Sequence, residues 1–344
     1  MKKQIKQILF TKPYLAQLVD NGTVDLNNLK DDEVAFQTMV TTISAGTEKA
    51  NYTGEKRVAG NTDYITPFPR TAGYSNASVV IGVGKEVKNL KIGDAVVVSG
   101  FSGHHKTYGV CKEKALIKIP DGVSLEDASI SYIATFPLGA LRKVELELGE
   151  SCLITGLGIL GTIAVKLARA MGAYPIVCLD PIKERREKAL EYGADYAFDP
   201  LDEKAIEKVK EVTGGGAKTA IEVTGIGAGL TITLDCMKPL GRVALLGCTR
   251  NSDFTIDYYR KVHSPGITLI GAHTNARPKE ESYPHYFTQN DEILAILNMI
   301  KGKRIVLKDI IIETHNPKDC QTVYDRLIND KKFPIGVQFD WRNL

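Results

Sequence analysis

The sequence predicts an α/β chain of two domains, one an all-β or barrel-like unit and the other a doubly wound parallel sheet. The chain has 344 residues, which is more than one hydrophobic core usually organises. Short apolar runs separated by turn residues fill residues 1–125, whereas from about residue 126 apolar strands alternate with amphipathic helices. Such alternation is typical of βαβ units. We therefore expect two lobes with a cleft between them.

The first domain is predicted from β-like runs bounded by glycine, proline or aspartate. These runs lie at 34–40, 77–81, 94–98, 310–313 and 337–341. Because the last two come at the end of the chain, we expect this end to return to the first domain. The first domain then comprises 1–125 and 276–344, and the second comprises 126–275.

The second domain is predicted from apolar strands with helical patterns between them. The expected strands lie at 151–155, 175–180, 219–224, 241–247 and 267–271. The expected helices of this domain lie at 160–171 and 183–192, and one more helical segment is expected beyond it, at 291–300. This order predicts a parallel sheet.

Composition and charge limit the kinds of partner. The hydrophobic and charged fractions, 43% and 25%, are those of an ordinary globular protein, and a net charge of +3 forms no concentrated basic field. The first ten residues lack the apolar core of a signal peptide, and no later apolar run has membrane-spanning length. We therefore expect a cytoplasmic protein that binds small molecules, with no nucleic-acid or membrane partner.

A glycine turn is the most informative local feature. Gly156-x-Gly158-x-x-Gly161 follows an apolar strand and opens a helix, and Asp180, 19 positions beyond Gly161, closes the next strand. This is the arrangement of a dinucleotide-binding βαβ unit. Gly156 permits a tight turn, Gly158 lets the backbone approach a pyrophosphate, and Gly161 lets helix and strand pack closely. The helix amides and dipole then favour the phosphate charge.

The acidic residue favours NAD over NADP. Asp180 would accept hydrogen bonds from the adenosine ribose hydroxyls and repel the extra phosphate of NADP. Arg185 and Arg186 follow closely and could attract that phosphate instead. The alternative to a cofactor site is an ordinary helix-capping loop with a surface aspartate.

The order of motifs resembles that of the medium-chain dehydrogenase/reductase family. The passages that carry this resemblance are Ala45–Glu48, Thr71–Ser75, Leu90–Asp94, Gly103–Tyr108, Gly156–Gly161 and Glu222–Gly225. The resemblance implies a GroES-like β-barrel catalytic domain, a Rossmann domain and a homodimer or homotetramer. The candidate cofactor-binding residues are Gly156, Gly158, Ile159, Leu160, Gly161, Asp180, Arg185, Thr224 and Gly247.

The sequence departs from zinc-dependent members of that family. The three positions that resemble their catalytic metal ligands hold Ala45, Tyr74 followed by Ser75, and Phe136. Alanine and phenylalanine cannot ligate zinc, and tyrosine is a poor substitute for imidazole. The six cysteines are dispersed, which favours buried free thiols over a structural zinc cluster. We therefore expect no zinc in either site.

Without a metal, a side chain must manage the substrate proton. Tyr74 is the first candidate, because a phenol can donate to or accept from an oxygen; alternatively, its ring only fills the vacated space. His105 resembles a position that faces the substrate in relatives. Thr47 resembles the hydroxyl of the family's proton relay, although Ala50 stands at the relay histidine. Glu48 could orient Tyr74 or a substrate hydroxyl, or pair with a structural arginine.

These residues predict a zinc-independent, NAD-dependent oxidoreductase that acts on a secondary alcohol or ketone of a polar substrate, such as a polyol, cyclitol or sugar derivative. An NAD(P)H-dependent quinone or enoyl reductase is the enzymatic alternative. An alternative of a different class is a non-catalytic dinucleotide-binding protein. Polar residues after the fifth strand, among them His273, His285 and Arg277, could line the far wall of the cleft.

Overall fold

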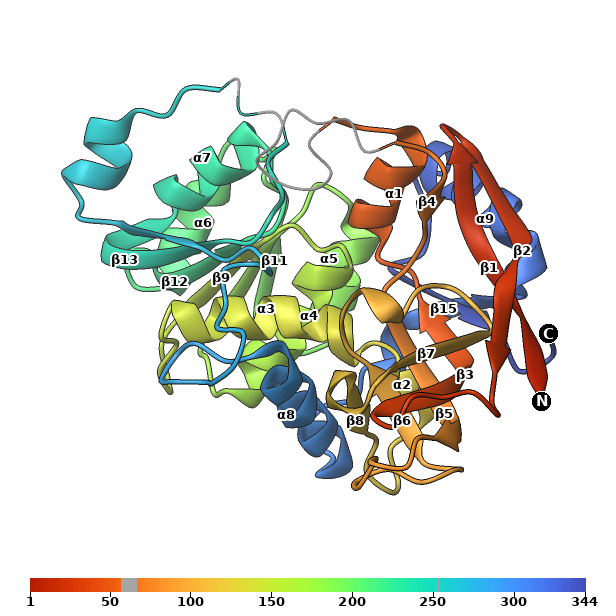
Figure 1. Ribbon diagram of the computed structural model, residues 1–344. Helices are drawn as coiled ribbons and strands as arrows, with labels where there is room; N and C mark the ends of the chain where they lie inside the picture. Colours follow the sequence, from red (N-terminus) through yellow and green to blue (C-terminus); the bar gives the residue numbers. More distant parts are fainter. Residues whose placement is uncertain (57–66, 251, 253) are drawn as a thin grey trace. The chain divides into compact units, whose positions relative to one another are not determined.

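The computed structural model describes residues 1–56, 67–250, 252 and 254–344 (Figure 1). Contacts divide the chain into two units, one formed by Met1–Ile133 with Ile293–Leu344 and the other by Ala134–Glu292. Both divisions fall inside a helix, α3 (Ser131–Lys143) or α8 (Gln289–Lys301). Of the divisions predicted from pattern alone, 125/126 falls inside the short helix α2 (Leu125–Ala128), and 275/276 falls in the segment between β14 (Thr268–Gly271) and α8.

The first unit is built from two β-sheets. Its smaller sheet has the order β2-β1-β4, and its larger sheet has the order β15-β16-β3-β5-β6-β8, with β7 also paired to β3. The strands are β1 (Lys2–Lys12), β2 (Leu15–Asp25), β3 (Glu33–Thr42), β4 (Arg70–Thr71), β5 (Ser75–Val83), β6 (Ala95–Val98), β7 (Tyr108–Lys112), β8 (Leu116–Lys118), β15 (Ile311–His315) and β16 (Gly336–Asp340). Its helices are α1 (Ala45–Thr53), α2 (Leu125–Ala128) and α9 (Cys320–Asn329).

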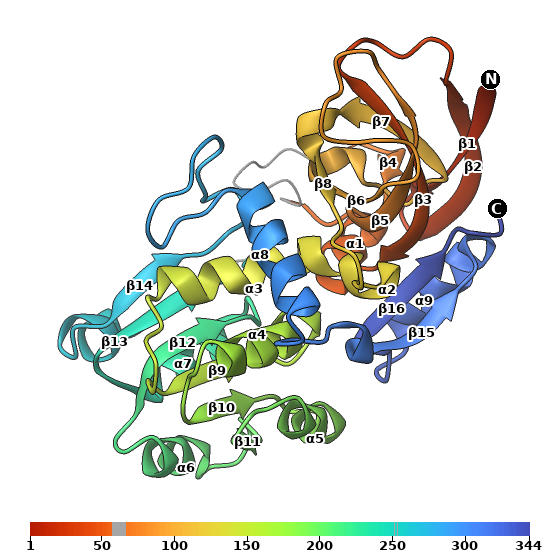
Figure 2. The ribbon, with the colours of Figure 1, turned by 90° about the horizontal axis from the view of Figure 1, so that it is seen from below.

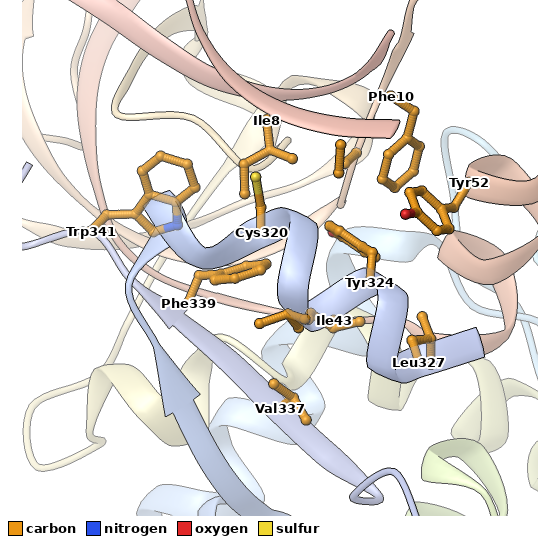
Figure 3. Close-up of a cluster of buried hydrophobic side chains, with 13 residues drawn as sticks. Ile8, Phe10, Ile43, Tyr52, Cys320, Tyr324, Leu327, Val337, Phe339 and Trp341 are labelled. Carbon is orange, nitrogen blue, oxygen red and sulfur yellow. The ribbon is translucent and has the colours of Figure 1, made fainter. Parts of the chain in front are cut away.

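The C-terminal segment is integral to this unit. Strand β16 pairs antiparallel with β3, with Phe339 opposite Thr41. Figure 3 shows the apolar cluster that joins the segment to β1 and α1. In it the ring of Tyr324 packs edge-on against Phe10, with 4.8 Å between ring centroids, and stacks on Tyr52 at 5.5 Å. Such aromatic pairs add to the stabilisation from burial.

The second unit contains a six-stranded, entirely parallel sheet in the order β11-β10-β9-β12-β13-β14. The strands are β9 (Cys152–Thr155), β10 (Ile176–Leu179), β11 (Tyr196–Phe198), β12 (Ala217–Glu222), β13 (Met237–Leu245) and β14 (Thr268–Gly271). The helices, besides those at the divisions, are α4 (Ile159–Ala170), α5 (Lys183–Glu191), α6 (Ala205–Val212) and α7 (Gly227–Asp235). Counted from β9, this is the strand order 3-2-1-4-5-6 of a doubly wound dinucleotide-binding sheet.

Helices pack against both faces of this sheet (Figure 2). Leu153 of β9 belongs to a cluster with apolar residues of α6 and α7. Its neighbour Ile154 points to the opposite face, where α4 packs close to it at Gly161. The predicted fold class, a β-rich GroES-like unit with a Rossmann sheet, is therefore confirmed. Strand β11 and helices α6 and α7 were not among the predicted elements.

The carboxyl ends of the strands are level with one another. Thr155 of β9 is in register with Leu179 of β10 and Glu222 of β12, and Glu222 is in register with Leu245 of β13. The sheet order reverses direction between β9 and β12, and ligands of such sheets bind at the carboxyl edge at this point. No helix among the described residues is long and apolar enough to cross a membrane.

Candidate functional site

The glycine turn lies at the carboxyl end of β9. Gly156 has a φ of +96°, a backbone conformation that favours glycine. A Cβ added to Gly161 would lie 1.8 Å from the carbonyl oxygen of Gly156, so only glycine lets α4 pack this closely on the turn. A Cβ added to Gly158 would meet no atom within 4 Å. The turn therefore has no room for a side chain at Gly161, whereas the space beside Gly158 is free of protein atoms.

The open side of the turn is the start of a helix. Gly158 is the N-cap of α4 and has no side chain with which to cap it, and Ile159 and Leu160 are the first helical residues. The first amides of a helix have no partner within it and point toward an approaching anion. The space at Gly158 and these amides fit a pyrophosphate, as a dinucleotide would require.

Asp180 ties the turn to the next strand. Its Oδ2 accepts a hydrogen bond from the amide of Leu157 at 2.8 Å, and its Oδ1 accepts one from the amide of Ile182 at 2.8 Å. The guanidinium of Arg185 lies 3.9 Å from Oδ2. Arg186 donates to the carbonyl oxygen of Asp180 at 2.7 Å and pairs with Asp199 at 3.3 Å. Of the two arginines, Arg186 therefore has its guanidinium paired with groups of the protein itself.

Thr224 and Gly247 meet beside the turn. Glu222 accepts hydrogen bonds from the hydroxyl of Thr224 and from its amide, the latter at 2.7 Å. Burial raises the pKa of Glu222, and these hydrogen bonds oppose the shift. A Cβ on Gly156 would lie 2.9 Å from the Thr224 methyl group, and one on Gly247 would lie 2.2 Å from the amide of Gly225. The structure therefore gathers the predicted cofactor residues at one sheet edge, with Glu222 holding one of their loops.

In the first unit, Tyr74 stands directly before β5. Its phenol donates to the hydroxyl of Ser44, the N-cap residue of α1, and its half-buried ring packs against Tyr132 at 5.3 Å between centroids. Burial raises the pKa of Tyr74 well above its usual value, although hydrogen bonds to Ser44 and Thr47 oppose the shift. The phenol is therefore protonated near neutral pH and can donate a hydrogen bond.

His105 lies in the core of the first unit, where its ring packs against Gly73, the residue before Tyr74. Its Nδ1 is 2.7 Å from the hydroxyl of Thr41, its Nε2 is 3.0 Å from Oε2 of Glu48, and the ring has no exposed surface. A Cβ on Gly73 would lie 2.5 Å from this ring, so glycine at that position lets the histidine pack there. With both nitrogens engaged, this geometry favours a supporting role over direct proton exchange with a substrate.

Glu48 is the centre of this buried network. It accepts hydrogen bonds from the Tyr324 hydroxyl at 2.5 Å and from the Ser44 amide at 2.7 Å, in addition to its contact with His105. Among the described residues, its partners do not include the arginine considered from the sequence. Because the hydroxyl of Ser44 also accepts the hydrogen bond of the Tyr74 phenol, Glu48 is linked to the phenol through one intervening residue. Ser44 had no sequence signal beyond its place before a helix.

The positions that resemble metal ligands are occupied by non-ligating side chains. Ala45 is the first residue of α1, and Phe136 lies in α3 of the second unit. Within residues 1–56, 67–250, 252 and 254–344, no group of three His, Cys, Asp or Glu side chains gathers as metal ligands would. The prediction of a zinc-free site stays a prediction.

A small pocket in the second unit brings together His273, His285 and Arg277, which were grouped from the sequence, with residues from other parts of the chain. Phe136 and Lys143 of α3 line it with His273, Arg277 and Glu292. Lys143 donates to the carbonyl oxygens of Gly271, at 3.2 Å, and Ala276, at 2.5 Å. These bonds fix the segment that follows β14.

Glu292 gives this pocket a testable pH dependence. Burial raises the pKa of Glu292 from its ordinary 4.5 to about 7, although Arg142 and Arg277 oppose the shift. A carboxyl with a raised folded-state pKa contributes stability below about pH 4.5 that is lost as the pH rises through about 7. We expect the unfolding free energy of the wild type, minus that of Glu292→Gln, to fall by about 2–3 kcal/mol from about pH 5 to about pH 8. Urea denaturation at both pH values measures this; a difference that does not change would refute it.

Comparison with known proteins assigns the family. Residues 160–289 match the zinc-binding dehydrogenase family, and residues 35–121 match the alcohol dehydrogenase GroES-like domain. The chain is 31% identical over 299 residues to L-threonine 3-dehydrogenase of Thermococcus kodakarensis, and the alignment covers 79% of this chain and 83% of that protein. It is 23% identical over 355 residues to D-guloside 3-dehydrogenase of Escherichia coli, covering 97% and 100%.

A solved structure shows the same fold. L-idonate 5-dehydrogenase of Escherichia coli superposes with a TM-score of 0.82 at 16% identity, covering 99% of each chain. The strand order, the glycine turn and the similarity to dehydrogenases over most of the chain agree with one another. The chain therefore belongs to the zinc-type medium-chain dehydrogenase family and is an oxidoreductase of the alcohol dehydrogenase type.

Proposed function

We propose that this protein is a zinc-independent, NAD-dependent oxidoreductase that interconverts a secondary alcohol and a ketone of a polar substrate. The observation that carries the proposal is the phenol of Tyr74. It stands where the family resemblance places a metal ligand, it is anchored by Ser44, and burial keeps its pKa above the usual range. A neutral phenol can supply the hydrogen bond and the proton that a metal-free site needs.

In the mechanism, bound NAD would supply the hydride chemistry. The amides of Ile159 and Leu160 would hold the pyrophosphate, and Asp180 would orient the adenosine ribose. In the direction of ketone reduction, Tyr74 would give its proton to the substrate oxygen, which becomes the alcohol hydroxyl, and its phenolate would then regain a proton from water. In the direction of oxidation, the phenol must first lose its proton, so the oxidation rate is expected to rise with pH up to the pKa of Tyr74.

NAD is favoured over NADP by the contacts of Asp180. Its carboxylate is fixed by two backbone amides at the end of β10, and Arg186 is engaged by Asp199. We expect Asp180→Ala to raise the preference for NADP over NAD by about tenfold, because the repulsion of the extra phosphate is lost. Dissociation constants of both cofactors, measured by calorimetry, test this. Glu184→Gln, an exposed acid nearby, is the control, and an unchanged preference would remove Asp180 from the site.

Zinc independence is tested by metal analysis. We expect the purified protein to contain no stoichiometric zinc and to keep its full activity after EDTA treatment and dialysis, since the three positions that resemble ligands hold Ala45, Tyr74 and Phe136. Elemental mass spectrometry and activity before and after chelation measure this. One tightly bound zinc per chain, whose removal abolishes turnover, would overturn the proposal.

The proposed substrate class is a polyol, cyclitol or sugar derivative. The relatives named above include dehydrogenases of threonine, a guloside and idonate, which are all polar hydroxyl compounds. NAD reduction with galactitol, myo-inositol, L-threonine and (R,R)-butane-2,3-diol tests the activity. NADPH oxidation with an enone tests the alternative of a quinone or enoyl reductase. NAD binding without turnover in either assay would instead support a non-catalytic dinucleotide-binding protein.

The protein is further proposed to be cytoplasmic and to form a homodimer or homotetramer. Apolar side chains on and beside the edge strand β14 support an assembly of this kind, since Leu269 is 37% and Leu240 is 69% exposed.

A further inference from the structure

The pocket at the carboxyl end of β14 is small and polar. It lies within the second unit, where α3 meets the segment 272–288, and its volume of about 10 Å³ suits one water-sized group. Several contacts fix this segment. Lys143 donates to the carbonyl oxygens of Gly271 and Ala276, and Tyr283 and Tyr286 stack at 5.2 Å between ring centroids and exchange backbone hydrogen bonds. Hydrogen bonds and ring stacking within the protein therefore fix the residues around the pocket.

Glu292 provides the pocket with an acceptor. Only 1% of the residue is exposed, and its Oε1 accepts from Arg142 at 2.9 Å. Its Oε2 is buried and has no hydrogen-bond partner among the described residues. Buried polar atoms are almost always paired, so this oxygen calls for a group that donates a hydrogen bond.

Two other residues provide donors. The Nδ1 of His273 accepts from the amide of Asn275 at 3.1 Å, which leaves the ring proton of the neutral imidazole on Nε2. Burial lowers the pKa of His273, and nearby cations add to this shift, so the ring is neutral near pH 7. Arg277 is held by a hydrogen bond from its Nε to the carbonyl of Thr274 at 2.8 Å and presents its guanidinium to the same pocket.

This combination selects the chemistry of the ligand group. An ionised carboxylate has no proton to donate to the free oxygen of Glu292, and an ammonium would be repelled by Arg277 and Lys143. A hydroxyl both donates and accepts, so it can serve the free oxygen of Glu292 and the donors together. Its size also matches the volume of the pocket.

The pocket lies on the sheet edge that carries the glycine turn. Gly271, the last residue of β14, is in register with Leu245 of β13, and β14 is three strands from β9. At the usual spacing between strands this is about 14 Å along the edge. We infer that this pocket is a substrate subsite, in which Glu292 accepts a hydrogen bond from one hydroxyl of a polyhydroxylated substrate and His273 and Arg277 donate to that hydroxyl. The inference rests on the proposed function and specifies its substrate class.

The test compares two alcohols that differ in how many hydroxyls they carry. For Glu292→Gln, we expect kcat/KM for galactitol to fall by about 10- to 100-fold, because an amide presents a donor as well as an acceptor. The value for (R,R)-butane-2,3-diol should stay within about twofold. His273→Asn keeps an acceptor for the Asn275 amide and removes the distal ring nitrogen, so it should show the same selectivity without disturbing a buried charge. Glu203→Gln, an exposed acid of the same unit, is the control.

A second measurement does not depend on turnover. Saturation-transfer NMR with galactitol should show binding to the wild type and to Glu203→Gln, and weaker binding to both pocket variants. The inference would be overturned if kcat/KM fell equally for both alcohols or if galactitol binding did not change in the pocket variants. A loss of NAD affinity in Glu292→Gln would also overturn it, and would assign the pocket to the amide of the cofactor. If galactitol binds at the pocket but no alcohol is oxidised, the proposed function fails and the subsite stands. If alcohols are oxidised but both pocket variants match the control, the subsite alone fails.

Discussion

Replacing Tyr74 by phenylalanine is expected to lower kcat for alcohol oxidation and ketone reduction by about 10²–10⁴-fold, the usual contribution of a positioned acid or base. The ring and its packing against Tyr132 are kept, while the hydroxyl that contacts Ser44 is lost. The affinity for NAD should not change, because the predicted cofactor residues lie in the second unit. Steady-state kinetics in both directions, with NAD binding measured by fluorescence, provide the comparison.

Two controls separate chemistry from structure. Tyr108→Phe removes a hydroxyl from another half-buried tyrosine of the same unit and should leave kcat within about twofold of the wild type. Ser44→Ala removes the anchor but keeps the phenol, and should lower kcat by about tenfold. The rise of the oxidation rate with pH should disappear in Tyr74→Phe. If Tyr74→Phe keeps wild-type turnover, the phenol is only filling space.

Replacing Gly158 by alanine is expected to weaken NAD binding by about 10- to 100-fold without destabilising the fold. The backbone angles of Gly158, a φ of −70° and a ψ of −169°, suit any residue, and an added Cβ meets no protein atom within 4 Å. The methyl group would instead occupy the space through which a pyrophosphate approaches the amides of α4. Calorimetric titration with NAD and the melting temperature of the unliganded protein measure the two effects.

Gly161→Ala is the matched comparison. Its added Cβ would lie 1.8 Å from the carbonyl oxygen of Gly156, so the helix must move away from the turn and the melting temperature should fall. The two glycines are only three positions apart, and both substitutions add one methyl group. Equal stability losses, or an unchanged NAD affinity in Gly158→Ala, would contradict the assignment of their roles.

The glycine turn at the carboxyl end of β9 could be predicted because its signals are local. The spacing of Gly156, Gly158 and Gly161, between a strand and a helix, is contained in a few residues, and Asp180 follows one strand later. Strands β9, β10, β12, β13 and β14 were predicted for a similar reason, since each contains a short apolar run that can be recognised in the sequence. Strand β11 has three residues and is half exposed, so it has little pattern to detect.

The network around Glu48 could not be predicted because its contacts span the chain. Glu48 meets His105 across 57 positions and Tyr324 across 276, and neither distance leaves a mark in the local sequence. Tyr74 was a candidate from the resemblance, but its hydrogen bond to Ser44 and the complete burial of His105 are set by the fold and have no local pattern in the sequence. Glu292 and Arg142, 150 positions apart, are a similar case in the second unit.

The discontinuous first unit has a consequence for synthesis of the protein. Residues 134–292 form one continuous unit, so that part can fold as soon as it leaves the ribosome. The first unit leaves earlier, yet it lacks β16, Tyr324 and Trp341 until residues 293–344 have been made. Until then, Glu48 lacks the hydroxyl of Tyr324, and Ile8 and Phe10 of β1 lack the apolar side chains that cover them, so we expect this nascent region to bind chaperones.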